Sequence, residues 1–127
     1  RWTDLDRDPQ ITIWMALNDS TIANGCVHIV PGSHHTLLNP EAGAGFLTPE
    51  MIDKLVAEHT PEPLELKAGE AALLHNWMLH SSEDNQTEVP RRAFSVCYQD
   101  ADTVSASGTT FPILFGEGAL EPETVAA

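Results

Sequence analysis

The stretch Leu74–Tyr98, LHNWMLHSSEDNQTEVPRRAFSVCY, contains the residues on which both the expected fold and the expected site depend. Its first part is apolar and ends at His80, and a polar loop follows. Its last part belongs to Arg91–Gln99, whose residues alternate between two faces as those of a β-strand do. Because histidine binds divalent metals and arginine binds carboxylates, the stretch predicts a metal ligand close to an anion-binding group.

Short strands separated by turns are expected on the N-terminal side of this stretch. Gln10–Leu17 is apolar and rich in β-branched residues, which predicts a central strand. Cys26–Val30 is expected to return beside it through the Asn24–Gly25 turn. Leu64–Lys67 and Ala71–His75 are predicted to be two further strands. Several short strands joined by turns favour an all-β sandwich or jelly roll over a parallel α/β sheet.

One helix is expected within this all-β pattern. Thr48 is a typical N-cap, a proline follows it, and the next apolar residues share one face, so Pro49–His59 is predicted to be a short amphipathic helix. It lies within residues 37–63, a long excursion between strands of the kind that forms lids and binding loops. Residues 101–127 are expected to be an irregular tail.

Composition limits the classes of function that fit the chain. Its 127 residues suffice for one domain, and no apolar run approaches the roughly 20 residues of a membrane-spanning helix. Six Lys plus Arg against 19 Asp plus Glu give a net charge of -13, which argues against nucleic acid or an anionic membrane as partner. Cys26 and Cys97 lie in apolar runs and are predicted to be free thiols of a reducing compartment. No targeting peptide is visible, so a cytoplasmic protein is expected.

Two pairs of residues are candidates for chemistry. His75 and His80 lie in an otherwise apolar segment, and either is a candidate metal ligand. Arg91 and Arg92 are neighbours on one strand, so only one can point inward, where its charge would need an anionic partner. A surface pair of arginines explains the same residues equally well.

Three segments together resemble, in their order and spacing, the phytanoyl-CoA dioxygenase family of iron- and 2-oxoglutarate-dependent oxygenases: Thr12–His35, Ala68–Asn85 and Arg91–Tyr98. The resemblance implies a single domain over residues 1–127 with a double-stranded β-helix, a cupin-like jelly roll that is incomplete at its N-terminal side. It also implies Fe(II) bound by an His-x-Asp pair and a distal histidine, with open positions for 2-oxoglutarate and molecular oxygen. The expected reaction is oxidation, typically hydroxylation, of a small organic substrate with release of succinate and CO2.

The resemblance also implies roles for individual residues. The distal metal ligand corresponds to His80, whereas His75 matches a position that is not a ligand. The arginine that binds the far carboxylate of 2-oxoglutarate follows the distal histidine by eleven residues, which selects Arg91 over its neighbour. Ser82 and Trp14 match positions that contact the co-substrate.

The sequence departs from the family pattern at the His-x-Asp pair. No histidine precedes His28, and Trp2–Asp4 resembles the motif only in its aspartate. Either the chain is the C-terminal portion of an oxygenase whose pair lies upstream of Arg1, which its abrupt start favours, or it has lost iron. In the first case the chain alone is expected to be inactive. In the second it is expected to be a metal-free jelly-roll binding module. A purely structural domain would leave the spacing of His80 and Arg91 unexplained.

Overall fold

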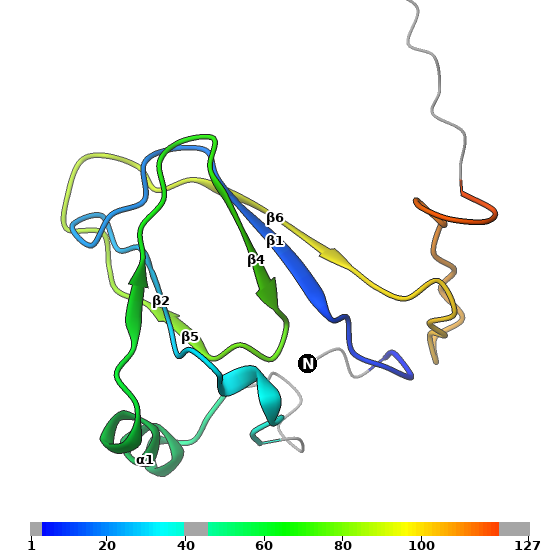
Figure 1. Cartoon of the computed structure of the whole chain (residues 1–127), viewed down its shortest axis with the longest axis horizontal. Helices are drawn as coiled ribbons and strands as arrows, with labels where there is room; N and C mark the ends of the chain where they lie inside the picture. The colour runs from blue at the N-terminus through cyan, green and yellow to red at the C-terminus, as the bar shows by residue number, and fades with distance from the viewer. Residues whose placement is uncertain (1–3, 40–45, 120–127) are drawn as a thin grey trace, which may run out of the picture.

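The computed structural model describes residues 4–39 and 46–119. The elements of this part are β1 (Ile11–Ala16), β2 (Val27–Ile29), the 3-10 helix η1 (Ser33–His35), α1 (Pro49–Glu58), β3 (Glu62–Leu64), β4 (Ala71–His75), β5 (His80–Ser82) and β6 (Ala93–Tyr98). The strands form two antiparallel three-stranded sheets, ordered β4-β1-β6 and β3-β2-β5 (Figure 1). In the described part, no helical segment combines the length and the hydropathy needed to traverse a bilayer. The expected combination of β-sheet with one short helix is confirmed.

β1 is the central strand of the first sheet, as its apolar sequence predicts. Ile13 lies opposite Leu73 of β4 and Val96 of β6, so both edges of β1 are paired. β-Branched residues are common in such central strands because they pack well on a pleated surface. Ala93 lies opposite Ala16, which places the two arginines before β6 rather than within it.

The expected return of Cys26–Val30 beside β1 is wrong. β2 lies in the second sheet, where it pairs with β3 and β5. The connection is too long for a two-residue hairpin, and Asn24, which is 3% exposed, folds it into a corner. The Asn24 side chain accepts a hydrogen bond from the Thr21 N–H and donates one to the Asp19 carbonyl, both at 2.8 Å. These bonds turn the chain away from the first sheet and into the second.

Two further strand boundaries differ from expectation. The strand expected at Leu64–Lys67 is largely wrong, because β3 runs from Glu62 to Leu64, contains Pro63 and shares only Leu64 with the expected range. Proline is tolerated there because β3 is an edge strand and one of its sides needs no N–H donor. The polar loop after His80 also starts later than expected, since His80–Ser82 pairs with β2 as β5.

The expected helix is present with the predicted cap. The Thr48 hydroxyl accepts a hydrogen bond from the Met51 N–H at 3.3 Å, and α1 ends at Glu58 with His59 as its C-cap. This cap provides an acceptor for one of the N–H groups that the first turn of a helix leaves without a partner. Figure 1 shows α1 at one end of the second sheet, on the side away from β6.

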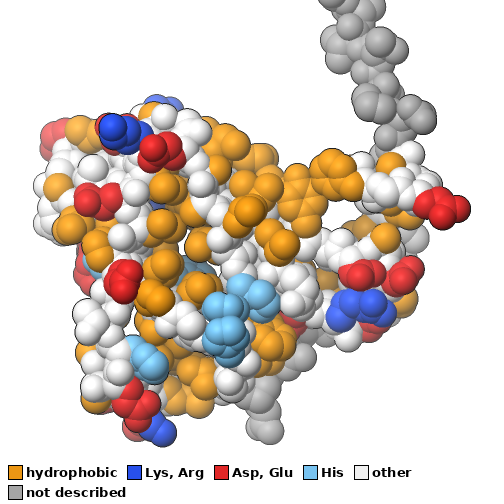
Figure 2. Space-filling view, viewed as in Figure 1, with side chains coloured by type: hydrophobic (Ala, Val, Ile, Leu, Met, Phe, Trp, Pro, Cys, Tyr) orange, Lys and Arg blue, Asp and Glu red, His pale blue; other side chains and the backbone are white. Residues whose placement is uncertain are grey.

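The buried core is small and lies at the corner between the sheets. Its apolar members are Ala16, Cys26, Val27 and Val30, which are at most 6% exposed. By contrast, the cross-strand register places Leu73 and Phe94 on one face of the first sheet, and they are 73% and 56% exposed. Figure 2 shows this apolar surface in orange. The corner is therefore where burial stabilises the described part most directly.

Gly25 offers a test of this corner. It has a φ of +78°, and a Cβ there would collide with the Glu83 carbonyl oxygen and lie 3.2 Å from its carbon. We expect Gly25→Ala to lower the free energy of unfolding by about 3 kcal/mol or more. Gly108 is a matched control, since its φ is also +78° but no atom lies within 4 Å of its Cβ position. Gly108→Ala should cost only about 1 kcal/mol in urea denaturation, and equal losses would contradict the packing argument.

Candidate metal and co-substrate site

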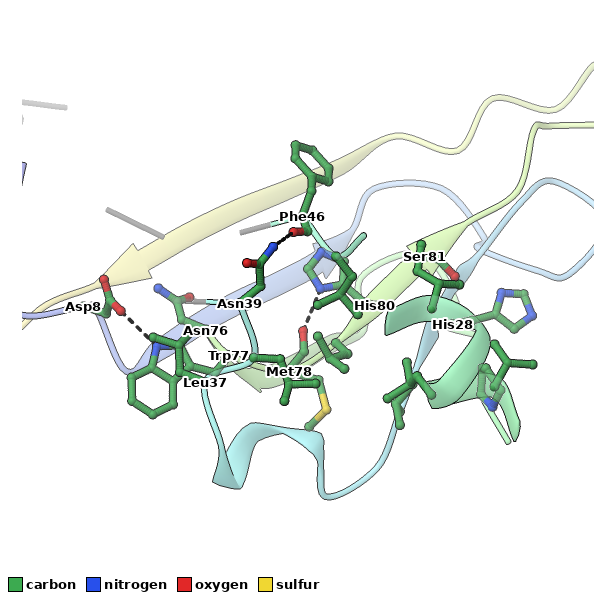
Figure 3. Close-up of a pocket in the computed structure, with 18 residues that line it drawn as sticks. Asp8, His28, Leu37, Asn39, Phe46, Asn76, Trp77, Met78, His80 and Ser81 are labelled. Carbon is green, nitrogen blue, oxygen red and sulfur yellow. Dashed lines mark hydrogen bonds between the residues drawn. The ribbon is translucent and has the colours of Figure 1, made fainter. Parts of the chain in front are cut away.

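A cavity of about 620 Å³ lies between the second sheet, α1 and the segment that connects them (Figure 3). His28, Val30, His80 and Ser81 line it from β2, β5 and the residue after β2. α1 contributes apolar side chains on the other side, and Asp8 and Asn76 contribute polar groups at one end. A cavity of this size, mostly apolar with a few convergent polar groups, is typical of small-molecule sites.

His80 stands at the start of β5 with one ring nitrogen engaged and the other available. Its Nδ1 lies 2.8 Å from the Met78 carbonyl oxygen (Figure 3). A carbonyl only accepts, so Nδ1 carries the proton and Nε2 keeps its lone pair. A histidine that binds a metal through one nitrogen and donates from the other to a carbonyl has this arrangement. His80 is therefore suited to fill one coordination position of a metal ion.

The turn between β4 and β5 fixes the carbonyl that orients His80. The Met78 N–H donates to the His75 carbonyl at 2.9 Å, and the Leu79 N–H donates to the Ser33 hydroxyl at 2.9 Å. The Trp77 N–H donates to His75 Nδ1 at 3.1 Å. The turn is thus held from η1 on one side and from the end of β4 on the other.

His75 has both ring nitrogens engaged by the protein. Since Nδ1 accepts from Trp77, the proton of the neutral ring lies on Nε2, which is 3.1 Å from the Gln10 side-chain oxygen. The ring also lies 5.3 Å from that of His34, and Figure 2 shows histidines gathered on this face. Burial lowers the pKa of His75, and the nearby His34 and His35 lower it further. The sequence did not predict this cluster, because it brings together η1 and the end of β4, which are far apart in the chain.

The two candidate arginines differ in their surroundings. The Arg92 Nε–H donates to the Asn18 side-chain oxygen at 2.9 Å, and Arg92 is exposed. Arg91 is half-buried and has no ion-pair partner within residues 4–39 and 46–119. Burial raises the pKa of Cys26 and the charge of Glu65 raises it further, while the positive charge of Arg91 lowers it.

The remaining predicted residues lie in different sheets. Ser82 is two residues after His80 on β5, so both side chains leave the same face of the strand. Ser82 also pairs with Val27, which adjoins Cys26. Cys26 is the residue whose pKa the charge of Arg91 lowers. Trp14 is half-buried at the centre of β1, opposite Ser95, and is not among the residues that line the cavity.

The described residues do not by themselves provide a complete set of ligands for a metal ion. Within residues 4–39 and 46–119, no three His, Cys, Asp or Glu side chains come together as a group that could hold a metal ion. His80 fits one position of an iron site, and this part of the chain does not complete the set.

We expect the burial of His75 beside His34 and His35 to make stability depend on pH. The pKa of His75 is lowered in the folded state, so its stabilising effect is complete above the unfolded-state pKa of 6.5 and is lost as pH falls through the folded-state pKa. Between about pH 7 and about pH 5 the free energy of unfolding should fall more steeply for the parent protein than for His75→Gln in urea titrations. His59→Gln, at the C-cap of α1, is the matched control and should follow the parent. Parallel curves for the parent and His75→Gln would contradict this role of His75.

Curated relatives match most of the chain. It is 31% identical over 99 residues to "Phytanoyl-CoA dioxygenase" of Arabidopsis thaliana, an alignment that covers 75% of this chain and 35% of the relative. It is 35% identical over 98 residues to "Phytanoyl-CoA dioxygenase domain-containing protein 1 homolog" of Dictyostelium discoideum, covering 71% and 34% respectively. The chain therefore spans about a third of the length of these relatives.

Two solved structures of similar fold are described as non-heme, α-ketoglutarate-dependent enzymes. The carbocyclase SnoK from nogalamycin biosynthesis is 26% identical with a TM-score of 0.66, covering 80% of this chain and 42% of that one. The epimerase SnoN, in complex with Fe3+, α-ketoglutarate and nogalamycin RO, is 28% identical with a TM-score of 0.61, covering 94% and 48%. The family model of phytanoyl-CoA dioxygenase (PhyH) matches residues 2–93, which confirms the expected resemblance. The chain belongs to the phytanoyl-CoA dioxygenase family.

Proposed function

We propose that the protein acts as the C-terminal portion of an Fe(II)- and 2-oxoglutarate-dependent oxygenase, with a double-stranded β-helix completed by residues outside this sequence. The reaction is oxidation, by hydroxylation, of a small organic substrate, with succinate and CO2 as co-products. The observation that carries this proposal is His80, whose Nδ1 is tied to the Met78 carbonyl while its Nε2 remains available beside the cavity. Family membership and the iron enzymes of similar fold support the same chemistry.

In this proposal His80 is one of three protein ligands, and an His-x-Asp pair from outside this sequence supplies the other two. Iron bound there supplies the activation of molecular oxygen that the reaction requires. The chain's own part is to orient His80. The Met78 carbonyl does so by accepting from Nδ1–H, which directs Nε2 of the ring away from this bond, and the turn that carries the carbonyl is fixed by His75 and Ser33.

Arg91 is proposed to bind the far carboxylate of 2-oxoglutarate. Its planar guanidinium can donate two parallel hydrogen bonds to one carboxylate. No described residue forms an ion pair with Arg91. Ser82 lies about 7 Å along β5 from His80 and on the same face, which suits a hydroxyl that contacts the co-substrate between its two ends. Trp14, on β1, is proposed to lie near the co-substrate from the other sheet. Residues 37–63 are proposed to form a lid.

A metal-free binding module is the second candidate. The observation that favours it is the lack of a three-ligand group among the described residues. The two candidates differ in one feature that sequence alone can decide, the presence of an His-x-Asp pair in the gene upstream of Arg1. Its presence supports the oxygenase, and its absence supports the binding module.

His80 is tested in protein extended upstream to include an His-x-Asp pair. We expect iron-dependent succinate formation by the parent and a loss of more than about 100-fold in His80→Ala, since even changes to residues behind metal ligands cost 10- to 100-fold. His59→Ala is the matched control, because His59 caps α1 and does not line the His80 cavity. Full turnover by His80→Ala would remove His80 from the iron site.

Arg91 is tested by its effect on co-substrate affinity in the same extended protein. We expect Arg91→Leu to raise the half-saturating concentration of 2-oxoglutarate by about 10- to 100-fold, as loss of a charge-assisted pair does. Arg92→Leu removes the same charge from the neighbouring position, where the side chain bonds Asn18, and should leave that concentration within about twofold. If only Arg92→Leu raises it, Arg92 takes the role instead.

A further inference from the structure

The wall of the His80 cavity that faces the second sheet is almost entirely hydrocarbon. Ile52, Leu55 and Val56 of α1 line it together with Leu37, Leu38 and Leu47 of the segment before the helix. The polar lining residues are His28, His80 and Ser81 on the strand side, Asp8 and Asn76 at one end, and Asn39 of the segment before the helix. A molecule that fills this space therefore meets hydrocarbon on the helix side and hydrogen-bonding groups mainly on the strand side and at one end.

Positive charge is missing from this cavity, and the chain has little of it to offer. Its six Lys and Arg comprise one at position 1, outside the described residues, and Arg7, Lys54, Lys67, Arg91 and Arg92. None of the five described ones lines the cavity, and residues 40–45, PEAGAG, contain no Lys or Arg.

Two of these cations, Arg7 and Lys54, lie beside other groups and outside the cavity. The Arg7 guanidinium lies 3.1 Å from the Asp6 carboxylate and 3.7 Å from that of Asp100. Lys54 is on α1, but it lines a separate cavity together with Glu58. These positions leave no described Lys or Arg to neutralise a phosphate beside the hydrocarbon wall.

The N-terminus of α1 does not replace the missing cations. Helix N-termini can bind anions through their free N–H groups. Here the Thr48 hydroxyl accepts from Met51, and the Glu50 carboxylate engages its own backbone N–H and Thr48, which lowers the pKa of Glu50. The chain's own carboxylate therefore stands where an anionic ligand would bind.

We propose that the cavity beside His80, as the described residues form it, binds an uncharged, largely apolar molecule that carries a hydroxyl or carbonyl group in preference to an acyl-CoA thioester. This inference rests on the proposed function, because it treats the cavity as the place where the oxidised molecule binds. Coenzyme A carries several phosphate charges, and no described Lys or Arg lines the cavity to compensate them in a chain of net charge -13.

The test measures binding to the 127-residue chain itself, without iron or 2-oxoglutarate. The neutral fluorophore N-phenyl-1-naphthylamine is bound first and then displaced by 1-dodecanol, below its aqueous solubility, or by dodecanoyl-CoA, below its critical micelle concentration. We expect dodecanol to displace the probe at a concentration at least about tenfold lower than the thioester does. Displacement by dodecanoyl-CoA at an equal or lower concentration would overturn the inference.

Variants at two neighbouring residues of α1 test where the probe binds. Ile52 is 45% exposed and lines the His80 cavity, whereas Met51 is 36% exposed and lines only the separate one. Ile52→Glu should weaken probe binding by about tenfold and Met51→Glu by less than about twofold. Val56→Glu repeats the test if Ile52→Glu loses helical circular dichroism. Equal effects of the cavity and control variants would place the probe elsewhere and overturn the inference. Because these measurements need no turnover, they are independent of whether the proposed oxygenase reaction occurs.

Discussion

The buried corner at residues 18–26 is the constraint on which the described architecture depends. Asn24 closes it from within, and it is tied outward by the pairing of Ser20 with Leu66 and by the contact of Gly25 with the Glu83 carbonyl. A buried amide that loses its partners costs more than its bonds contribute when made, so such a corner is held strongly to one conformation. Glu83 directly follows β5, and the corner directly follows β1. The spacing between the central strand of one sheet and the strand that carries His80 is therefore set here.

The same corner explains how the two halves of the proposed site come together. Cys26 and Val27 leave the corner fully or nearly buried, and Val27 pairs with Ser82. The positive charge of Arg91, which lies just before β6, lowers the pKa of Cys26 against the larger effect of burial. Cys26 thus adjoins the pair of Val27 and Ser82 on one side and is influenced by the charge of Arg91. A site with a metal ligand at one end and a carboxylate anchor at the other needs such a rigid link, because both ends of one co-substrate must fit at once.

Local sequence patterns predicted the elements well, and non-local contacts set the rest. β1, β4 and α1 follow from apolar spacing and from the Thr48 cap, all of which act over a few residues. The partner of β2 was predicted wrongly because the Asn24–Gly25 pair signals a hairpin, while the bonds of the Asn24 side chain close a wider turn instead. His80 and Arg91 were identified through family resemblance. The His75 bond to Gln10 was not, since it joins residues 65 positions apart and no periodicity encodes it.

The net negative charge of the chain does not prevent the binding of a dianionic co-substrate. Repulsion by surface carboxylates and attraction by a contacting guanidinium act over different distances. Charges on the surface are screened beyond about 8 Å at physiological salt, whereas a guanidinium in contact with a carboxylate is not. Arg91 is half-buried, so its charge acts in a medium less polar than water and its contacts are stronger than those of an exposed pair. No described Lys or Arg lines the hydrocarbon wall of α1, so no local positive charge offsets the net charge of -13 there. On the proposed assignments, a small dianion binds at Arg91 and a larger polyanion is disfavoured beside the hydrocarbon wall, because the positions of the few cations matter more for selectivity than their total charge.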